Sequence, residues 1–171
     1  MIIRQENKSD FMAIYQLVKT AFETAEVKDG HEQDLVNELR NSNKYIPELA
    51  LVAEQDGKII GYIMLTKTNV ENDTDKIEVL YLAPVAVAIE YRDQKVGSEL
   101  ICTANKKAQD MGFKAVFLAG NPAYYNRFSF VPTIRHGIKC SVEIPEKLYE
   151  NIMVCELYPQ ALNGVSGIVE F

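Results

Sequence analysis

The chain has 171 residues, of which 47% are apolar and 25% charged, a balance typical of a soluble globular domain with a substantial core. Its formal net charge of −6 argues against a large electrostatic contribution to nucleic-acid binding, and we expect no nucleic-acid partner. No run of about 18 apolar residues is present and the N-terminus lacks the apolar core of a signal peptide, so we expect neither a membrane span nor a membrane partner.

Cysteine and histidine usage narrows the chemistry further. Cys102, Cys140 and Cys155 include no CxxC pair, which predicts free thiols in a reducing cytoplasm. His31 and His136 are too far apart in the sequence to suggest a metal centre, and we expect no metal.

The first half of the chain predicts two helices and four strands. Asn7, Ser9 and Asp10 offer a helix start, and apolar residues then recur at helical spacing to Phe22. A second helix is expected from Gly30 to Leu39. The expected strands are residues 2–4, 48–54, 58–67 and 77–87, with a hairpin turn at Asp56-Gly57 and a polar loop over 70–76.

The second half begins with the strongest helical pattern, Gly97 to Met111, which Gly112 ends as a C-cap. A buried strand, Ala115 to Ala119, follows. Residues 120–130 predict a turn and a short helix, because Pro122 suits a first helical position. Further strands are expected at 138–142, 151–156 and 167–171.

This order of elements indicates an α/β (α+β) fold. We expect a single, mixed, mostly antiparallel sheet of about six or seven strands with helices on both faces. One domain should span residues 1–171, in which residues 138–171 complete or extend the sheet.

The turn between the strand 77–87 and the long helix is the strongest candidate for chemistry. Backbone N–H groups at a helix start have no internal partners, so those from Asp93 to Ser98 can surround a pyrophosphate. Gly97 permits close approach, and Arg92 and Lys95 add positive charge. By these residues alone, an ordinary strand-to-helix turn with a solvated charge cluster remains the alternative.

The whole segment from Leu80 to Pro132 resembles the GNAT superfamily of acetyl-CoA-dependent N-acetyltransferases. Arg92 and Gly97 fill the first and last places of that family's Q/R-x-x-G-x-G/A turn, with Lys95 where the first glycine is usual. The family's late aromatic-tyrosine pair and Gly-Phe appear as Tyr124-Tyr125 and Ser129-Phe130. The phrases NPAYYNRFSFVP and ALNGVSGIVEF are similar to a branch of uncharacterised bacterial members.

The resemblance implies an acetyl-CoA site. Its Val85-Ala86-Val87 strand would pair with the pantetheine arm and polarise the thioester carbonyl through backbone amides. We expect Lys95 to avoid positive φ, because adopting that conformation costs a residue with a side chain roughly 1 kcal/mol. The cofactor-binding residues implied are Val85, Ala86, Val87, Arg92, Asp93, Gln94, Lys95, Val96, Gly97, Ser98, Asn121, Tyr124 and Asn126.

The same resemblance assigns Tyr125 as the general acid that protonates the departing thiolate of coenzyme A. A phenol with a reference pKa near 10 stays protonated at neutral pH and suits a thiolate of similar basicity. The alternative is that Tyr124 and Tyr125 only pack against the helix or the coenzyme.

A general base is less well defined. Glu78 lies on the same strand as the pantetheine-binding residues and shares a face with Leu80 and Leu82, which makes it the first candidate. Asp29, His31 and Glu32 are weaker candidates, and an amine that arrives neutral needs no protein base.

The resemblance thus predicts a cytoplasmic enzyme, monomeric or homodimeric, that acetylates a primary amine of a small molecule or peptide by direct attack in a ternary complex. One alternative is a non-catalytic acyl-CoA-binding sensor or partner module on the same fold. Another is an aminoacyl- or other acyltransferase with a different acceptor pocket.

Overall fold

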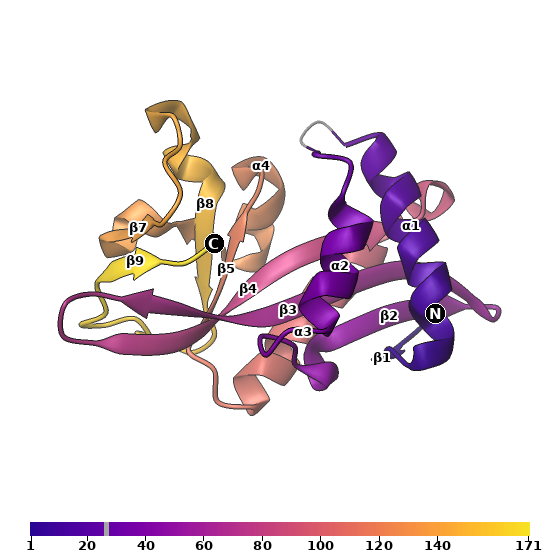
Figure 1. Cartoon of the computed structure of the whole chain (residues 1–171), viewed down its shortest axis with the longest axis horizontal. Coiled ribbons are helices and arrows are strands. Elements are labelled where there is room, and N and C mark those ends of the chain that lie inside the picture. The colour runs from indigo at the N-terminus through magenta and orange to yellow at the C-terminus, as the bar shows by residue number, and fades with distance from the viewer. Residues whose placement is uncertain (26–27) are drawn as a thin grey trace. The chain divides into compact units, whose positions relative to one another are not determined.

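A computed structural model describes residues 1–25 and 28–171. Its helices are α1 (Phe11–Glu23), α2 (Glu32–Arg40), α3 (Val96–Asp110) and α4 (Pro122–Tyr125) (Figure 1). Its strands are β1 (Ile2–Gln5), β2 (Ala50–Gln55), β3 (Lys58–Glu71), β4 (Lys76–Val87), β5 (Ala115–Ala119), β6 (Val131–Pro132), β7 (Ile138–Cys140), β8 (Ile152–Glu156) and β9 (Gly167–Val169).

The described strands form a nine-stranded mixed sheet. Its main order is β1-β2-β3-β4-β5-β8-β6, and β9 pairs with both β3 and β7. The β4–β5 and β7–β9 pairs are parallel, whereas β1–β2, β2–β3, β5–β8, β6–β8 and β3–β9 are antiparallel. The expected mixed, mostly antiparallel sheet is confirmed, with nine described strands where about six or seven were expected.

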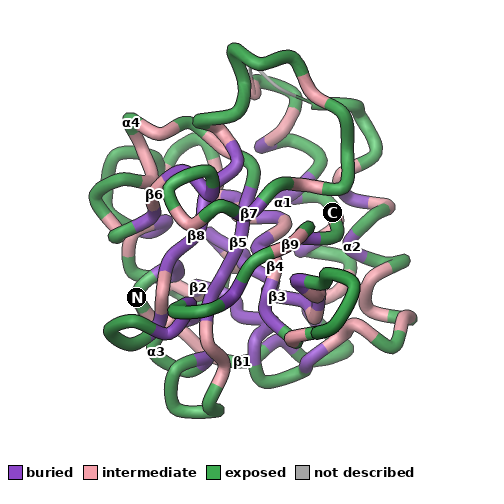
Figure 2. Tube along the Cα trace, turned by 90° about the vertical axis from the view of Figure 1, so that its left-hand side faces the viewer, coloured by how far each residue is buried: buried purple, intermediate pink, exposed green. Residues whose placement is uncertain are grey.

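The chain divides into two compact units, and both β3 and β4 begin in one unit and end in the other. The first unit comprises Met1–Thr66 and Ala83–Lys107, and the second comprises Lys67–Leu82 and Ala108–Phe171. Buried residues follow the strands in both units (Figure 2). The expectation of one domain over residues 1–171 stays a prediction.

Helices cover both faces of the first unit's strands. Ile14 and Val18 of α1 and Val36 of α2 pack with Val52 and Tyr62, which form a cross-strand pair of β2 and β3. The next pair, Ala53 and Gly61, points to the opposite face. There Gly61 meets Val96 and Leu100 of α3, so α3 covers the face that α1 and α2 leave open.

A buried ion pair holds the end of α2 in the first unit. Arg40 donates to both carboxylate oxygens of Glu6 at 2.9 and 2.8 Å, and the Tyr45 hydroxyl donates to the same carboxylate at 2.7 Å. The Arg40 guanidinium also lies 3.8 Å from the centroid of the Phe11 ring. Because the buried carboxylate is paired and hydrogen-bonded, removing either partner would leave an uncompensated charge.

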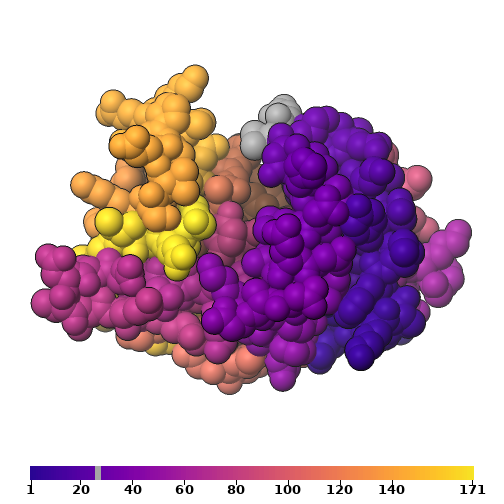
Figure 3. Space-filling model, viewed as in Figure 1, coloured from indigo at the N-terminus to yellow at the C-terminus, as the bar shows by residue number. Residues whose placement is uncertain are grey.

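The second unit has a separate apolar core. Val79 of β4, Phe117 of β5 and Val154 of β8 pack with Ile138 of β7 and Val169 of β9. In the space-filling view, the orange surface of residues 133–151 lies against the yellow surface of the C-terminal segment, as the β7–β9 pairing requires (Figure 3).

Most expected elements are present, and the differences have local causes. The strand expected from residue 48 begins at Ala50, because Pro47 opens a 3₁₀ helix, η2 (Pro47–Leu49). The loop expected over 70–76 is shorter, because Val70 and Glu71 extend β3 by pairing with β9. The strand expected over 138–142 ends at Cys140.

Two further searches concern the described residues only. No described helix combines the length and apolarity needed to cross a membrane. Within residues 1–25 and 28–171, no group of three or more His, Cys, Asp or Glu side chains is arranged to hold a metal ion.

Candidate functional site

The β4–α3 turn has the backbone of an anion-binding concavity. Asp93 and Lys95 have φ values of 60° and 66°, whereas the intervening Gln94 does not have positive φ. Left-handed residues in a short turn can direct neighbouring N–H groups toward one concave side. The expectation that Lys95 avoids positive φ is therefore wrong: the lysine adopts the conformation that a glycine would take without strain.

The start of α3 adds further donors to this turn. The Glu99 N–H donates to the Lys95 carbonyl at 2.9 Å, which begins the helical ladder. The N–H groups of Val96, Gly97 and Ser98 precede that bond, and helix geometry gives them no partner one turn back. The positive end of the helix dipole lies at the same place, so this turn can attract a phosphate or another anion.

Close packing places α3 on β3. A Cβ built on Gly61 would lie 2.8 Å from Val96 Cγ1 and 2.9 Å from Leu100 Cδ1. Because these distances are shorter than normal contacts, the first two turns of α3 can pack this close to β3 only because Gly61 has no side chain. The Ala88 N–H also donates to the Ile60 carbonyl at 2.9 Å and thereby holds the end of β4 to the same strand.

Two polar side chains of the turn have partners in the first unit. The Arg92 Nη2 donates to the Ala21 carbonyl near the end of α1 at 2.9 Å. The Gln94 Nε2 donates to the Glu90 carbonyl at 2.9 Å. The Arg92 guanidinium therefore ties the turn to α1.

Val85, Ala86 and Val87 form the last residues of β4, in the same unit as the turn. Ala86 is buried and packs with the core beneath α1 and α2. Val85 and Val87 are half-buried and alternate with it. The structure thus brings these three residues, Arg92 and the stretch from Asp93 to Ser98 together in the first unit.

Tyr125 lies in the second unit, at the end of α4. The Asn121 side chain accepts from the Ala123 N–H at 2.9 Å and caps this helix, with Pro122 at its first position. A Cβ on Gly120 would lie 2.7 Å from Tyr125 Cδ2, so the phenol ring lies directly against the glycine. Its centroid is 4.9 Å from that of Tyr124, edge-on, and 5.8 Å from that of Phe130.

Burial has the largest effect on the pKa of the Tyr125 hydroxyl. It raises the pKa of this phenol well above the usual value, and interactions with Tyr124 and Tyr81 raise the pKa further. The raised pKa keeps the phenol protonated through the physiological range. Tyr125 as a whole is half-buried, and its protonated hydroxyl can donate a proton to a strong base.

The residues beside and after Tyr125 complete this segment of the second unit. The Arg127 guanidinium lies 4.2 Å from the centroid of the Tyr124 ring. Asn126 follows α4 as its C-cap residue. Ser129 has φ 65°, so a second position where the resembled family has glycine retains the left-handed backbone with a side chain.

The candidate bases lie in different settings. Glu78 is 52% exposed, and its carboxylate is 3.7 Å from the Lys67 ammonium. Strand alternation places Glu78 on the face opposite Val79 and Tyr81. The structure therefore does not bring Glu78 to the side of Tyr81, the residue with which Tyr125 interacts.

The weaker base candidates belong to the first unit, where their polar groups bond to one another. The Glu32 carboxylate accepts from the Asp29 and Gly30 N–H groups at 2.7 and 3.2 Å. His31 Nδ1 lies 3.4 Å from Asp34 Oδ2, in an exposed pair. These contacts are typical of a solvated helix start.

Two features of the second unit lie outside the residues that sequence reasoning selected. One is Tyr81, whose half-buried phenol also has a pKa raised by burial. The other is a cavity of about 690 Å³ lined by residues between Thr133 and Ile152. Apolar residues alternate at Ile138, Cys140, Val142 and Ile144. This alternation continues past the end of β7, and it is the sequence pattern from which the cavity could have been predicted.

Comparisons with known proteins agree on one family. The model of a family described as "Acetyltransferase (GNAT) family" matches residues 11–130. The uncharacterized N-acetyltransferase YhbS of Escherichia coli K12 is 33% identical over 173 residues, covering 100% of this chain and 96% of that protein. The uncharacterized N-acetyltransferase YjhQ of the same strain is 33% identical over 142 residues, covering 82% of this chain and 76% of that protein.

Solved structures show the same fold. The crystal structure of E. coli YhbS in complex with CoA has a TM-score of 0.87 and 31% identity, and the match covers 99% of this chain and 88% of that chain. A Brucella melitensis GNAT family acetyltransferase in complex with acetyl-CoA has a TM-score of 0.78 at 22% identity, covering 99% and 94% of the two chains.

Proposed function

Because the chain belongs to the GNAT acetyltransferase family, we propose that it transfers an acetyl group from acetyl-CoA to a primary amine. The observation that carries this proposal is the β4–α3 turn, whose two left-handed residues and open helix start suit the binding of a pyrophosphate. The CoA-bound structure of YhbS, similar to this chain over nearly its full length, supports the same cosubstrate.

The proposed reaction is direct attack in a ternary complex. The amine nitrogen bonds to the thioester carbonyl carbon, and backbone N–H groups of the Val85–Val87 segment stabilise the oxyanion that develops. When the carbon–sulfur bond breaks, the Tyr125 hydroxyl donates its proton to the CoA thiolate. The amine loses its own proton, and the products are an N-substituted acetamide and CoA.

Glu78 remains a hypothesis as the base that accepts the amine proton. Its ion pair with Lys67 and its place on the face opposite Tyr81 favour two other routes. In the first, water removes a proton from the bound ammonium before attack, and in the second, the amine binds in its neutral form. In both, water takes the proton that the nitrogen loses after attack. Neither route requires a protein carboxylate.

The free thiols Cys102, Cys140 and Cys155 support a reducing compartment, and we place the enzyme in the cytoplasm. Besides acetyl-CoA, the reaction requires a small-molecule or peptide amine, whether the enzyme works as a monomer or a homodimer.

Replacing Tyr125 with phenylalanine tests the acid role. We expect kcat for thiol release from acetyl-CoA to fall by about 10²-fold, because the thiolate must then leave without a positioned proton donor. The Kd for acetyl-CoA should change less than threefold, since the ring and its packing remain. An unchanged kcat would show that Tyr125 only packs.

The pH dependence provides a second readout. Because burial raises the Tyr125 pKa, the acid stays protonated as the pH rises, and kcat should show no descending limb below about pH 10. A panel of amines, peptides and aminoglycosides serves as the acceptor screen. Tight acetyl-CoA binding without thiol release across this panel would identify a sensor module instead.

A further inference from the structure

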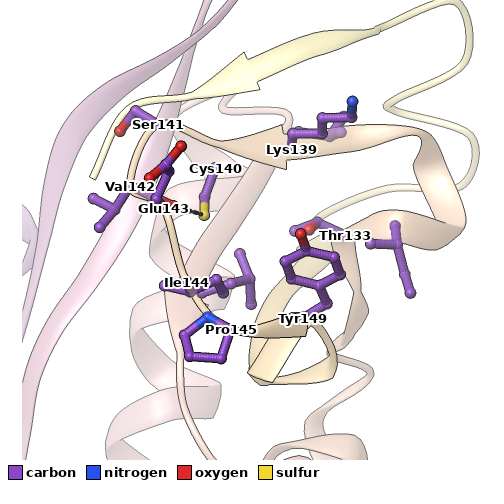
Figure 4. Close-up of a pocket in the computed structure, with 12 residues that line it drawn as sticks. Thr133, Lys139, Cys140, Ser141, Val142, Glu143, Ile144, Pro145 and Tyr149 are labelled. Atoms are coloured by element: carbon purple, nitrogen blue, oxygen red, sulfur yellow. Dashed lines mark hydrogen bonds between the residues drawn. The ribbon is translucent and has the colours of Figure 1, made fainter. Parts of the chain in front are cut away.

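The second unit contains a cavity that the family match does not include. It has a volume of about 690 Å³, within the range of small-molecule sites. Its lining comes entirely from residues 133–152, whereas the family model ends at residue 130 (Figure 4). The cavity therefore belongs to the part of the chain that lies beyond the family's common core.

The lining of the cavity is mainly apolar. Ile138 and Ile152 are buried, and Ile144 is half-buried beside them. Figure 4 shows the Tyr149 ring and the Cys140 thiol directed into the space, whereas the Lys139 ammonium is directed away from that ring. Such walls favour an apolar ligand body, because burying apolar surface is favourable and burying an unpaired charge is costly.

The charged side chains at this cavity are Glu143 and Lys139, so the lining can accommodate at most one cationic group. Glu143 is the only carboxylate among the lining residues, and it is exposed at the rim. It can pair with one ammonium group. A second or third ammonium on the same ligand would enter apolar surroundings without a partner.

The cavity lies at the same end of the second unit's strands as Tyr125. Ile152, at the start of β8, pairs with Ala119 at the end of β5. Gly120, which follows Ala119, donates its N–H to the Asn151 carbonyl at 2.8 Å and lies against the Tyr125 ring. Ala119 thus pairs with a residue that lines the cavity, and the next residue, Gly120, contacts the ring of the proposed acid.

A second chain of contacts joins the same two places. Tyr81, which interacts electrostatically with Tyr125, lies 4.6 Å from Phe171 between ring centroids. The Phe171 N–H donates to the Ser141 Oγ at 3.1 Å, and Ser141 lines the cavity. Both chains of contacts lie within one compact unit.

We propose that this cavity binds the apolar body of the acceptor, and that the acceptors are monocationic aryl- or alkylamines. The inference rests on the proposed acetyl transfer. The ammonium first loses a proton to solvent, and the neutral nitrogen then forms the bond to the acetyl carbon. The carbon–sulfur bond breaks as CoA leaves with the Tyr125 proton. The nitrogen releases its second proton to solvent, which returns one proton to Tyr125. Polyamines and aminoglycosides are poor substrates in this assignment, because one rim carboxylate cannot neutralise them.

Filling the cavity from its rim tests the assignment. Val142 lines the cavity and is 52% exposed, so Val142→Trp should fold normally while occupying part of the space. The matched control is Ile168→Trp, because Ile168 is 48% exposed on β9 and does not line the cavity. Thiol release from acetyl-CoA is measured with phenethylamine, hexylamine and spermidine.

We expect the wild type to prefer phenethylamine and hexylamine over spermidine by at least about tenfold in kcat/KM. Val142→Trp should raise KM for both apolar amines about tenfold or more with kcat within twofold, whereas Ile168→Trp should match the wild type. A preference for spermidine would overturn the assignment. Equal KM values for the two tryptophan variants would also overturn it.

Direct binding separates this inference from the proposed function. Phenethylamine binding is measured by ligand-observed NMR without acetyl-CoA. Protection of Cys140 from alkylation is followed in parallel, in a Cys102→Ala background. If no amine releases thiol but phenethylamine binds the wild type and not Val142→Trp, acetyl transfer fails, and the cavity is a binding site for apolar amines but not an acceptor site. If thiol is released while phenethylamine neither binds nor protects Cys140, the cavity assignment fails alone.

Discussion

At the scale of single residues, the two replaced family glycines are informative. Lys95 and Ser129 have φ values of 66° and 65°, which place both in the left-handed region. A side chain in this region costs roughly 1–2 kcal/mol relative to glycine. The backbone conformation is therefore maintained by its surroundings. At Lys95 those surroundings are the start of α3 and the Arg92–Ala21 hydrogen bond.

Lys95→Gly should stabilise the protein by about 1 kcal/mol, because glycine adopts positive φ without steric cost. The measurement is the free energy of unfolding in urea, with the Kd for acetyl-CoA as a second readout. The matched control is Gln94→Gly, which should lose about 0.5–1 kcal/mol, since Gln94 has no strain to relieve. If the Lys95→Gly protein were less stable than the wild type, that result would contradict the inference that the Lys95 backbone is strained.

Gly120 lies directly against the ring of Tyr125, the proposed acid. An added methyl group at this residue would overlap the Tyr125 ring and displace it. We expect Gly120→Ala to lower kcat by about tenfold or more, while KM for acetyl-CoA changes little. The control is Ala123→Gly on the exposed side of α4. An unchanged kcat in Gly120→Ala would show that the ring position is not critical.

At the scale of elements, the position of α3 depends on its close approach to β3. Its first turns meet Gly61, and the N–H groups of the proposed phosphate-binding turn lie at the same end of the helix. The position of these donors is therefore determined by a contact between two elements, which a strand and a helix with larger facing residues would not allow.

Gly61→Val should displace the start of α3. We expect a loss of about 1–3 kcal/mol in stability, together with at least about tenfold weaker acetyl-CoA binding. Ile60→Val provides the comparison, because removing one buried methyl group from the neighbouring residue should cost about 0.5–1.5 kcal/mol with unchanged acetyl-CoA affinity. Equal affinities in the two variants would separate α3 packing from cofactor binding.

At the scale of the whole molecule, two compact units have separate apolar cores, yet β3 and β4 contribute residues to both. The proposed phosphate-binding turn belongs to the first unit and the proposed acid to the second. A ligand that binds only the folded chain stabilises that state by mass action.

Acetyl-CoA should therefore raise the melting temperature. At 100 times its Kd it contributes about 2.7 kcal/mol, which corresponds to a shift of roughly 5–10 °C for a chain of this length. Differential scanning calorimetry measures the shift, and acetate and pantethine serve as controls without the pyrophosphate. No shift at saturating acetyl-CoA would contradict the proposed cosubstrate.

Much of the local structure could be predicted from short-range signals. Gly112 ends α3 with φ 86°, Asp56-Gly57 turns the β2–β3 hairpin with two positive φ values, and Pro122 begins α4. Each signal acts through the conformational limits of its own residue, which are the same in any chain. The family resemblance likewise rested on residues close together in the sequence, and the comparisons confirm it.

Long-range pairing required the tertiary structure. Residues 70–71 join β3 because β9, almost one hundred positions later, pairs with them. The Arg92 guanidinium reaches the Ala21 carbonyl, and Lys95 adopts a conformation that its own preference opposes. The cavity between Thr133 and Ile152 exists because β7, β8 and the intervening segment pack around it. Local signals thus determine where elements begin and end, and packing between distant residues determines what the elements enclose, because its energy depends on neighbours that the local sequence does not specify.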